Sequence, residues 1–280
     1  MADRESDTEV FASISYIGTV PEGEKAYHMM YGDDGPIPRT NITRIWRQTR
    51  FENVRNQMGA LSFDRHGIAI HELHTAMTYQ DYGCDQKVRD IYFRELEQHL
   101  QQFLGASKVE VFRYAIRKRH TEFPVSKGTQ YAFAQPTLIA HVDATLLSTM
   151  EEIVKRFGDG AKDLSSKRHQ WVNVWKPLRG PVNDWPLCFC DASSVHPEDI
   201  ETTDMVYADY FTENQSLRFN SEQKWFYLSD HQPDEIIIFK QSDSDSRAVG
   251  GVPHCSFANP AAHPEESPRE SIEARALVFY

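Results

Sequence analysis

The second half of the chain places the strongest constraint on the fold. After Gly158 it consists of short β-prone runs every ten to fifteen residues, which are "WVNVWKPL", "PLCFCDA", "MVYADY", "KWFYLSD", "EIIIFKQ", "VPHCSF" and "SIEARALVFY". This spacing is typical of a sandwich or barrel rather than of βαβ units. The final run closes on the apolar residues "RALVFY", and a terminal segment is ordered only when it pairs into a sheet or docks on a core. We therefore expect it to be a strand that the barrel requires.

Two helices are expected before this region. In the segment 86–104, apolar residues recur every three or four positions, and Gly105 follows as a C-cap. The run "TLLSTMEEIVKRFG" predicts a second helix that ends at Gly158, with one apolar face made by Leu146, Leu147, Met150, Ile153, Val154 and Phe157. The β-prone pieces of this half are "VFASISYIGTV", "ALSF", "IAIHEL", "KVEVFRYAI" and "FAQPTLIAHVD".

No internal repeat or long linker divides the 280 residues, so we expect a single domain, 1–280. Residues 1–130 would form a β/α portion that flanks the barrel, and residues 131–280 would form the barrel itself. The sequence therefore predicts a mainly β fold with flanking helices.

Composition excludes several function classes. A net charge of −11 argues against a nucleic-acid surface, which needs clustered Lys and Arg. The basic run "RKRH" (117–120) is interpreted as a solvated strand end, and the acidic stretch 198–213 as a solvated loop. No run of about 18 apolar residues could cross a membrane, and the start "MADRESDTEV" lacks the pattern of a secretory signal. We expect a cytoplasmic protein with four reduced, mostly buried cysteines.

The sharpest chemical signal is "IAHVDAT", in which His141 and Asp143 are separated by one residue. On a strand both side chains share one face, with Cα atoms about 6.6 Å apart, so an imidazole and a carboxylate can bind one cation. Four H-x-[DE] triplets occur, but only this one ends an apolar strand and leads directly into a helix. By contrast, the histidines of "HELH" are three residues apart, which does not match the i, i+4 spacing of helical zinc ligands.

A third ligand should come from a distant strand of the same barrel. His254 in "GGVPHCSF" fits, although a histidine in a turn or core would look the same, and Cys255 should face away from it. Further along, Arg269 and Ser271 in "PRESIEARALVFY" share a strand face and could together bind a carboxylate.

The order H-x-D, distant His, then R-x-S resembles the Fe(II)- and 2-oxoglutarate-dependent dioxygenases of the double-stranded β-helix, or jelly-roll, fold. Longer phrases resemble more narrowly the CmcJ/AsaB-like hydroxylase/desaturase family of fungal secondary metabolism, namely "HVDAT", "QWVNVWKPLRGPVNDWPLCFCDASSV", "FYLSDHQPDEIIIFKQSDSD", "GVPHCSFANP" and "PRESIEARALVF". The resemblance is specific from about residue 134 to the end and looser before it.

The resemblance implies a jelly-roll core, with the metal site in residues 131–280, and an oxygenase that hydroxylates, desaturates or cyclises a small metabolite. His141, Asp143 and His254 would hold Fe(II), leaving room for 2-oxoglutarate and O2. Arg269 and Ser271 would bind the far carboxylate of 2-oxoglutarate, with Arg275 as the rival anchor. The alternatives are a jelly-roll protein that binds metal without oxidation, and a zinc hydrolase that uses the same ligands.

Four further residues are candidates for contacts to substrate or cosubstrate. Asn173 and Trp175 lie on one face of a strand expected to line the barrel, and Gln135 and Thr137 precede the ligands. For Trp175, core packing is an equally open interpretation, and for Asn173 a structural hydrogen bond is the favoured one. The sequence leaves the oligomeric state and the substrate itself open.

Overall fold

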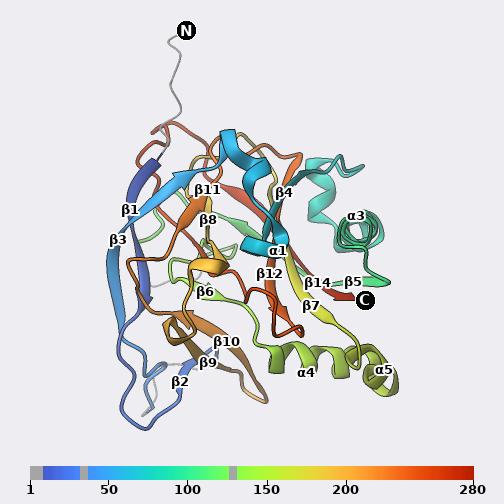
Figure 1. Cartoon of the computed structure of the whole chain (residues 1–280). Coiled ribbons are helices and arrows are strands. Elements are labelled where there is room, and N and C mark those ends of the chain that lie inside the picture. Colours follow the sequence, from blue (N-terminus) through green and yellow to red (C-terminus); the bar gives the residue numbers. More distant parts are fainter. Residues whose placement is uncertain (1–8, 32–36, 126–130) are drawn as a thin grey trace.

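The structure is a computed structural model that describes residues 9–31, 37–125 and 131–280. Fourteen strands in the described residues form two sheets (Figure 1). The larger sheet has the order β1-β3-β11-β8-β13-β6-β10-β9-β2 and the smaller has the order β4-β12-β7-β14-β5. The predicted mainly β fold with flanking helices is therefore confirmed. The start of the chain, residues 1–8, lies outside the described residues.

The strands have the following bounds: β1 Glu9–Ile17, β2 Ala26–Met29, β3 Arg44–Asn53, β4 Ile68–Glu72, β5 Lys108–Lys118, β6 His141–Val142, β7 His169–Pro177, β8 Leu187–Cys190, β9 Ile200–Val206, β10 Phe211–Leu217, β11 Trp225–Tyr227, β12 Glu235–Asp243, β13 His254–Ser256 and β14 Glu270–Phe279. The helices and helical turns are η1 Arg55–Ala60, α1 Phe63–His66, η2 Tyr79–Gly83, α2 Asp85–Lys87, η3 Val88–Tyr92, α3 Phe93–Leu104, α4 Leu146–Phe157, η4 Gly158–Gly160, α5 Ala161–Ser165, η5 Ala192–Ser194 and η6 Pro197–Asp199.

The closing strand β14 lies inside the smaller sheet, paired with β7 on one side and β5 on the other. Its side chains alternate between two faces, as the pleat requires. Ile272, Ala274 and neighbouring apolar residues pack with Leu96 and Leu100 of α3 in one cluster, and Figure 1 shows α3 beside β5 and β14. The opposite face of β14 therefore points toward the larger sheet and carries Arg269 at its head, then Ser271 and Arg275. The expectation that the last run is a required strand agrees with this central position.

The first 130 residues supply the edges of both sheets. β1 and β2 are the two outer strands of the larger sheet, and β4 and β5 are those of the smaller sheet. Apart from β3, the interior strands come from the second half of the chain, and five of them, β7, β8, β12, β13 and β14, form the centre of the fold. Their residues are almost entirely buried, which explains why the sequence of that half reads as a series of apolar runs.

Both predicted helices are present in the structure. The segment 85–104 is helical throughout, passes through a π turn at Val88–Tyr92 and ends at Gly105 with φ +63°. In α4, however, part of the apolar face lies in solvent, since Leu147 and Val154 are 54% and 56% exposed. The helix instead docks through Ile153 and through Thr149, whose hydroxyl lies 2.6 Å from that of Ser242.

Several short predictions were wrong. "ALSF" is not a strand, because it forms the end of η1 and the start of α1. The stretch 198–213 is not a loop, because it contains β9 and the start of β10. "FAQPTLIAHVD" pairs only through isolated bridges until β6, and the polar strand β3 was not expected at all.

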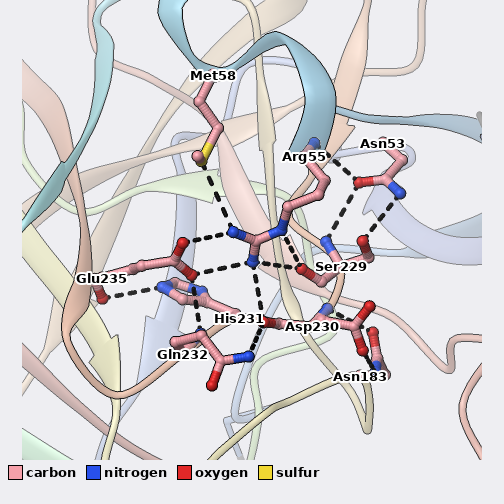
Figure 2. Close-up of polar contacts among 9 residues, drawn as sticks. All are labelled: Asn53, Arg55, Met58, Asn183, Ser229, Asp230, His231, Gln232 and Glu235. Atoms are coloured by element: carbon pink, nitrogen blue, oxygen red, sulfur yellow. Dashed lines mark hydrogen bonds and ion pairs between the residues drawn. The ribbon is translucent and has the colours of Figure 1, made fainter. Parts of the chain in front are cut away.

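An arginine ties the N-terminal portion to the connection between β11 and β12 (Figure 2). Arg55 donates to the carbonyl oxygen of Ser229 from Nε at 2.9 Å and forms a double ion pair with the Glu235 carboxylate, with Nη2 2.9 Å from Oε2. It also donates to the carbonyl of Asp230, a residue with φ +47°. The buried His231 follows in the same turn, and one of its ring nitrogens, Nε2, lies 3.0 Å from the Glu235 carbonyl oxygen.

Three of the four cysteines are buried and all four are free thiols, which confirms the prediction from composition. Within the described residues, no helix combines the length and the apolar character that crossing a membrane would require.

Candidate metal centre

Two histidines meet where β6 and β13 pair. His254 and His141 are direct partners across the antiparallel strands, and their ring centroids are 4.4 Å apart. Nδ1 of each ring lies near a backbone carbonyl oxygen, at 2.8 Å from Ile139 for His141 and 3.1 Å from Val252 for His254. Because each Nδ1–H donates to a carbonyl, each Nε2 keeps a free lone pair, as metal-binding histidines require.

The environment keeps His254 neutral. Burial and the nearby His141 lower the pKa of His254 to about 3. A neutral imidazole is the form that binds a cation, so His254 needs to lose no proton at physiological pH.

Asp143 completes the group. Its Oδ1 lies 3.5 Å from His141 Nε2, and the two side chains are 11% and 12% exposed. One ligand atom from each of His141, Asp143 and His254 lies within 4.8 Å of the others. The structure therefore brings together the three residues that the sequence analysis selected, although His254 lies more than a hundred residues beyond the other two.

The opposite sheet holds the Asp143 carboxylate in place. Its Oδ2 accepts a hydrogen bond from Asn173 Nδ2 on β7 at 2.7 Å and pairs with Arg275 Nη2 on β14 at 3.0 Å. The backbone N–H of Asp143 donates to Gln241 Oε1 on β12 at 2.7 Å. Burial alone would raise the pKa of Asp143, but Arg275 and His141 outweigh it and hold the pKa well below its usual range. Oδ1 stays available on the side of the histidines.

Arg269 reaches across from β14 to the larger sheet. Its Nη1 donates to Ser256 Oγ and to the Trp185 carbonyl oxygen, both at 2.6 Å. Ser256 shares a face of β13 with His254, so Arg269 ends close to the histidine. Its guanidinium also lies 5.4 Å from the Trp175 ring centroid. Burial and the neighbouring Arg117 lower the pKa of Arg269 to about 9.

Two buried polar atoms near the head of β14 have no hydrogen-bond partner in the described part of the chain, namely Arg269 Nε and Ser271 Oγ. Buried polar groups normally have partners, so a pair of free donors suggests a binding site for an anionic oxygen. Arg275, the rival anchor, is already engaged by Asp143 and also donates to Glu273 Oε1 at 3.3 Å.

A cavity of about 440 Å³ opens onto His141 and Asp143. Thr137 lines it, as predicted for a residue that contacts substrate. Gln135 is not among the lining residues, and its side chain instead bonds to the backbone of Lys118 and His120. Asn173 contacts the metal-ligand candidate Asp143 itself, and Trp175 lies buried beneath Arg269.

The structure also shows where other residues singled out in the sequence lie relative to this centre. The two histidines of "HELH" are not part of this centre, because His71 pairs with His99 at 2.9 Å between ring nitrogens. Cys255 faces away from His254 and lies 3.4 Å from the Cys188 sulfur. Sequence reasoning missed Gln241 and the supporting contact of Arg275, because both depend on which strands become neighbours. The alternation that puts Arg275 on the same face as Arg269 was the one available signal.

Comparisons with known proteins agree with this geometry. A family model described as "Oxidoreductase/YMDC permease-like domain" matches residues 14–279. The Fe(II)/2-oxoglutarate-dependent dioxygenase nvfI of Aspergillus novofumigatus is 31% identical over 91% of this chain and 91% of its own length. The alpha-ketoglutarate-dependent dioxygenase tstK of Talaromyces stipitatus is 30% identical over 88% of this chain and 93% of its own length.

A solved structure of the iron and alpha-ketoglutarate-dependent endoperoxidase NvfI superposes with a TM-score of 0.86 at 28% identity. The match covers 98% of this chain and 99% of that one. The predicted jelly-roll core is thereby confirmed.

Proposed function

Since this chain belongs to the family of Fe(II)/2-oxoglutarate-dependent dioxygenases that tailor fungal secondary metabolites, we propose that His141, Asp143 and His254 are its iron ligands. The observation that carries the proposal is the convergence of their ligand atoms within 4.8 Å. Two imidazoles and one carboxylate form the ligand set typical of non-haem Fe(II) oxygenases, so the residues present fit the metal.

The proposed site for the cosubstrate lies at the start of β14. We assign the distal carboxylate of 2-oxoglutarate to Arg269 and Ser271, whose unpartnered Nε and Oγ are donors that fit a carboxylate. Bound iron and 2-oxoglutarate supply the oxidising chemistry, in which decarboxylation of the cosubstrate to succinate is coupled to oxidation of a small-molecule substrate.

The protein residues contribute position and charge. Arg275 and Asn173 fix the carboxylate of Asp143 through Oδ2, which leaves Oδ1 directed toward the metal position. The Nδ1 contacts of both histidines fix their ring orientation and tautomer. Phe239, whose ring centroid lies 4.8 Å from that of His254, helps to exclude water behind the ligands.

The test is reconstitution under nitrogen with Fe(II) and 2-oxoglutarate, followed by exposure to air. We expect a charge-transfer absorption in the visible range and then release of succinate. Asp143→Ala and His141→Ala should each lower turnover by more than about 100-fold, since changes even in groups that support ligands cost 10–100-fold.

His71→Ala is the matched control, because it removes a half-buried histidine outside the centre and should leave both signals unchanged. Full activity in Asp143→Ala would remove that residue from the ligand set. A non-oxidative metal-binding protein would give no succinate at all. Turnover that needs Zn²⁺ and no O2 would point instead to a hydrolase with the same ligands.

A further inference from the structure

The cavity that opens onto His141 and Asp143 combines an apolar body with basic walls. Met30, Ile139, Met205 and Trp171 supply apolar lining. The same wall carries five cationic side chains, Arg44, Arg113, Arg117, Lys155 and Arg275, against only two carboxylates, Asp143 and Glu152. In a chain with a net charge of −11, such a concentration of positive charge is a local feature of this cavity.

Two of these cations already have partners inside the protein. Arg275 pairs with Asp143 and Glu273. Arg117 donates from Nη1 to the carbonyl oxygen of Gln135 at 2.7 Å. Of the two carboxylates, Asp143 is assigned to the metal, and Glu152 lies 3.5 Å from Arg156 on the same helix.

The other three cations, Arg44, Arg113 and Lys155, come from β3, β5 and α4 and line one space. Within the described residues, none of their side chains makes a hydrogen bond or an ion pair. The Nζ of Lys155, an exposed residue, lies 6.0 Å from the centroid of the Tyr210 ring. Tyr210 in turn stacks on Tyr207 at 4.4 Å between centroids, so the cation faces an aromatic surface at the cavity wall.

Of the three cations, Arg113 gives the strongest indication that the ligand is anionic. It lies directly opposite Arg275 across the β5–β14 pair. Like charges at directly opposite positions destabilise a sheet unless other groups compensate them. The charge of Arg275 is compensated by Asp143 and Glu273, whereas Arg113 is exposed and has no such partner in the described residues, so its charge is free to meet a ligand that carries negative charge.

The cosubstrate 2-oxoglutarate is not the ligand that we assign to Arg44, Arg113 and Lys155. Arg269 and Ser271 are assigned to 2-oxoglutarate, and neither of them lines this cavity. We propose that the cavity binds small molecules with an apolar body and an anionic group such as a carboxylate, and that Arg113, Lys155 and Arg44 recognise that group. This inference rests on the proposed function, because the bound molecule is a substrate only if the protein is the oxygenase proposed above.

A pair of fluorescent probes tests the inference without knowledge of the substrate. 8-Anilino-1-naphthalenesulfonate carries one negative charge, and N-phenyl-1-naphthylamine has the same aromatic frame without it. We expect the wild-type protein, with 2-oxoglutarate at saturation, to bind the anionic probe about tenfold more tightly than the neutral one, as charge-assisted hydrogen bonds predict. This preference should weaken as salt concentration rises.

The double variant Arg113→Gln, Lys155→Gln should lose most of the tenfold preference and keep its affinity for the neutral probe. Arg44→Gln alone should reduce the preference in part. Arg65→Gln is the matched control, because Arg65 is an exposed arginine outside the cavity, and it should behave as the wild type does.

Equal affinity for the two probes in the wild type would overturn the inference, as would a preference that survives in the double variant or vanishes in Arg65→Gln. A preference for the anionic probe that is present without 2-oxoglutarate but lost when the cosubstrate is at saturation would show that the cations serve the cosubstrate, which also overturns the inference. Release of succinate by the same preparation, measured without any substrate, reports on the proposed function separately, because probe binding does not need iron.

Discussion

Arg269 and Arg275 share one face of β14 but contact different groups. Arg275 pairs with a candidate iron ligand, whereas Arg269 has a free Nε beside the free hydroxyl of Ser271. The choice between them as the anchor for 2-oxoglutarate, which the sequence left open, can therefore be made by experiment at the level of single side chains.

We predict that Arg269→Gln raises the KM for 2-oxoglutarate by about tenfold or more, because a charge-assisted contact to a carboxylate is lost. Its affinity for Fe(II) should stay near that of the wild type. Arg275→Gln should do the reverse, with iron bound about 10–100-fold more weakly and a nearly unchanged KM, because it removes support from Asp143. Succinate release and iron titration of the two variants side by side give the answer, and exchanged phenotypes would reverse the two assignments.

At the scale of residues, the sequence was better at selecting the candidate site residues than at predicting which side chains they contact. His141 and Asp143 could be selected because theirs is the one H-x-[DE] triplet that ends an apolar strand, and His254 because it follows on a distant strand in the order that the family resemblance implies. For Asn173 a structural hydrogen bond was favoured over a contact to substrate or cosubstrate, and its amide does bond to Asp143. The sequence could not name that partner, because alternation along one strand shows which face a residue occupies, while its partner depends on which strand lies opposite.

The turn between β11 and β12 contains a buried histidine that should make the stability of the fold depend on pH. His231 is 2% exposed in this turn, and burial lowers its pKa to about 4. The ring contacts the Glu235 carbonyl and lies within the network that Arg55 organises (Figure 2).

Below pH 6.5 the unfolded chain takes up a proton on His231 that the folded chain does not accept until about pH 4. The folded state should therefore lose stability as the pH falls through this window, by up to about 1.4 kcal/mol per pH unit from this group. Urea unfolding of the metal-free protein at several pH values measures the slope. His231→Gln should flatten it relative to the wild type, while His263→Gln, an exposed histidine, should not. An equal slope in wild type and His231→Gln would contradict the prediction.

At the scale of elements, the sequence predicted best where burial was complete. β7, β12 and β14 are covered on both faces, so most of their residues are buried and each contains a recognisable apolar run. β3 and β10 were missed because their side chains are largely polar and partly exposed, and the partners that make them strands are distant in sequence. The apolar face of α4 was assigned by periodicity, yet Leu147 and Val154 remain exposed because contacts to the sheets are made by Ile153 and Thr149.

At the scale of the whole molecule, we propose that the chain unfolds as one unit. The N-terminal portion supplies edge strands to both sheets, and Arg55 clamps it to the turn between β11 and β12. Because these strands are hydrogen-bonded into both sheets, we do not expect the N-terminal portion to unfold separately from the barrel.

Denaturation in urea should accordingly give coincident single transitions by tryptophan fluorescence and by far-UV circular dichroism. Arg55→Ala should lower the free energy of unfolding by about 2 kcal/mol, less than for a fully buried pair because Arg55 is partly exposed. Arg50→Ala, which breaks an exposed pair with Glu9, should change it by less than about 0.5 kcal/mol. Two separated transitions would show that the N-terminal portion is a domain of its own.

The order of the strands along the chain has a consequence for biosynthesis. Both histidines and Asp143 leave the ribosome before β14 does, yet Arg269 and Arg275 arrive only with that strand. On the proposed assignment, a nascent chain would carry all three iron ligands before the residues that orient the Asp143 carboxylate and bind the keto acid. The metal centre would then be completed only when the last strand of the smaller sheet is in place.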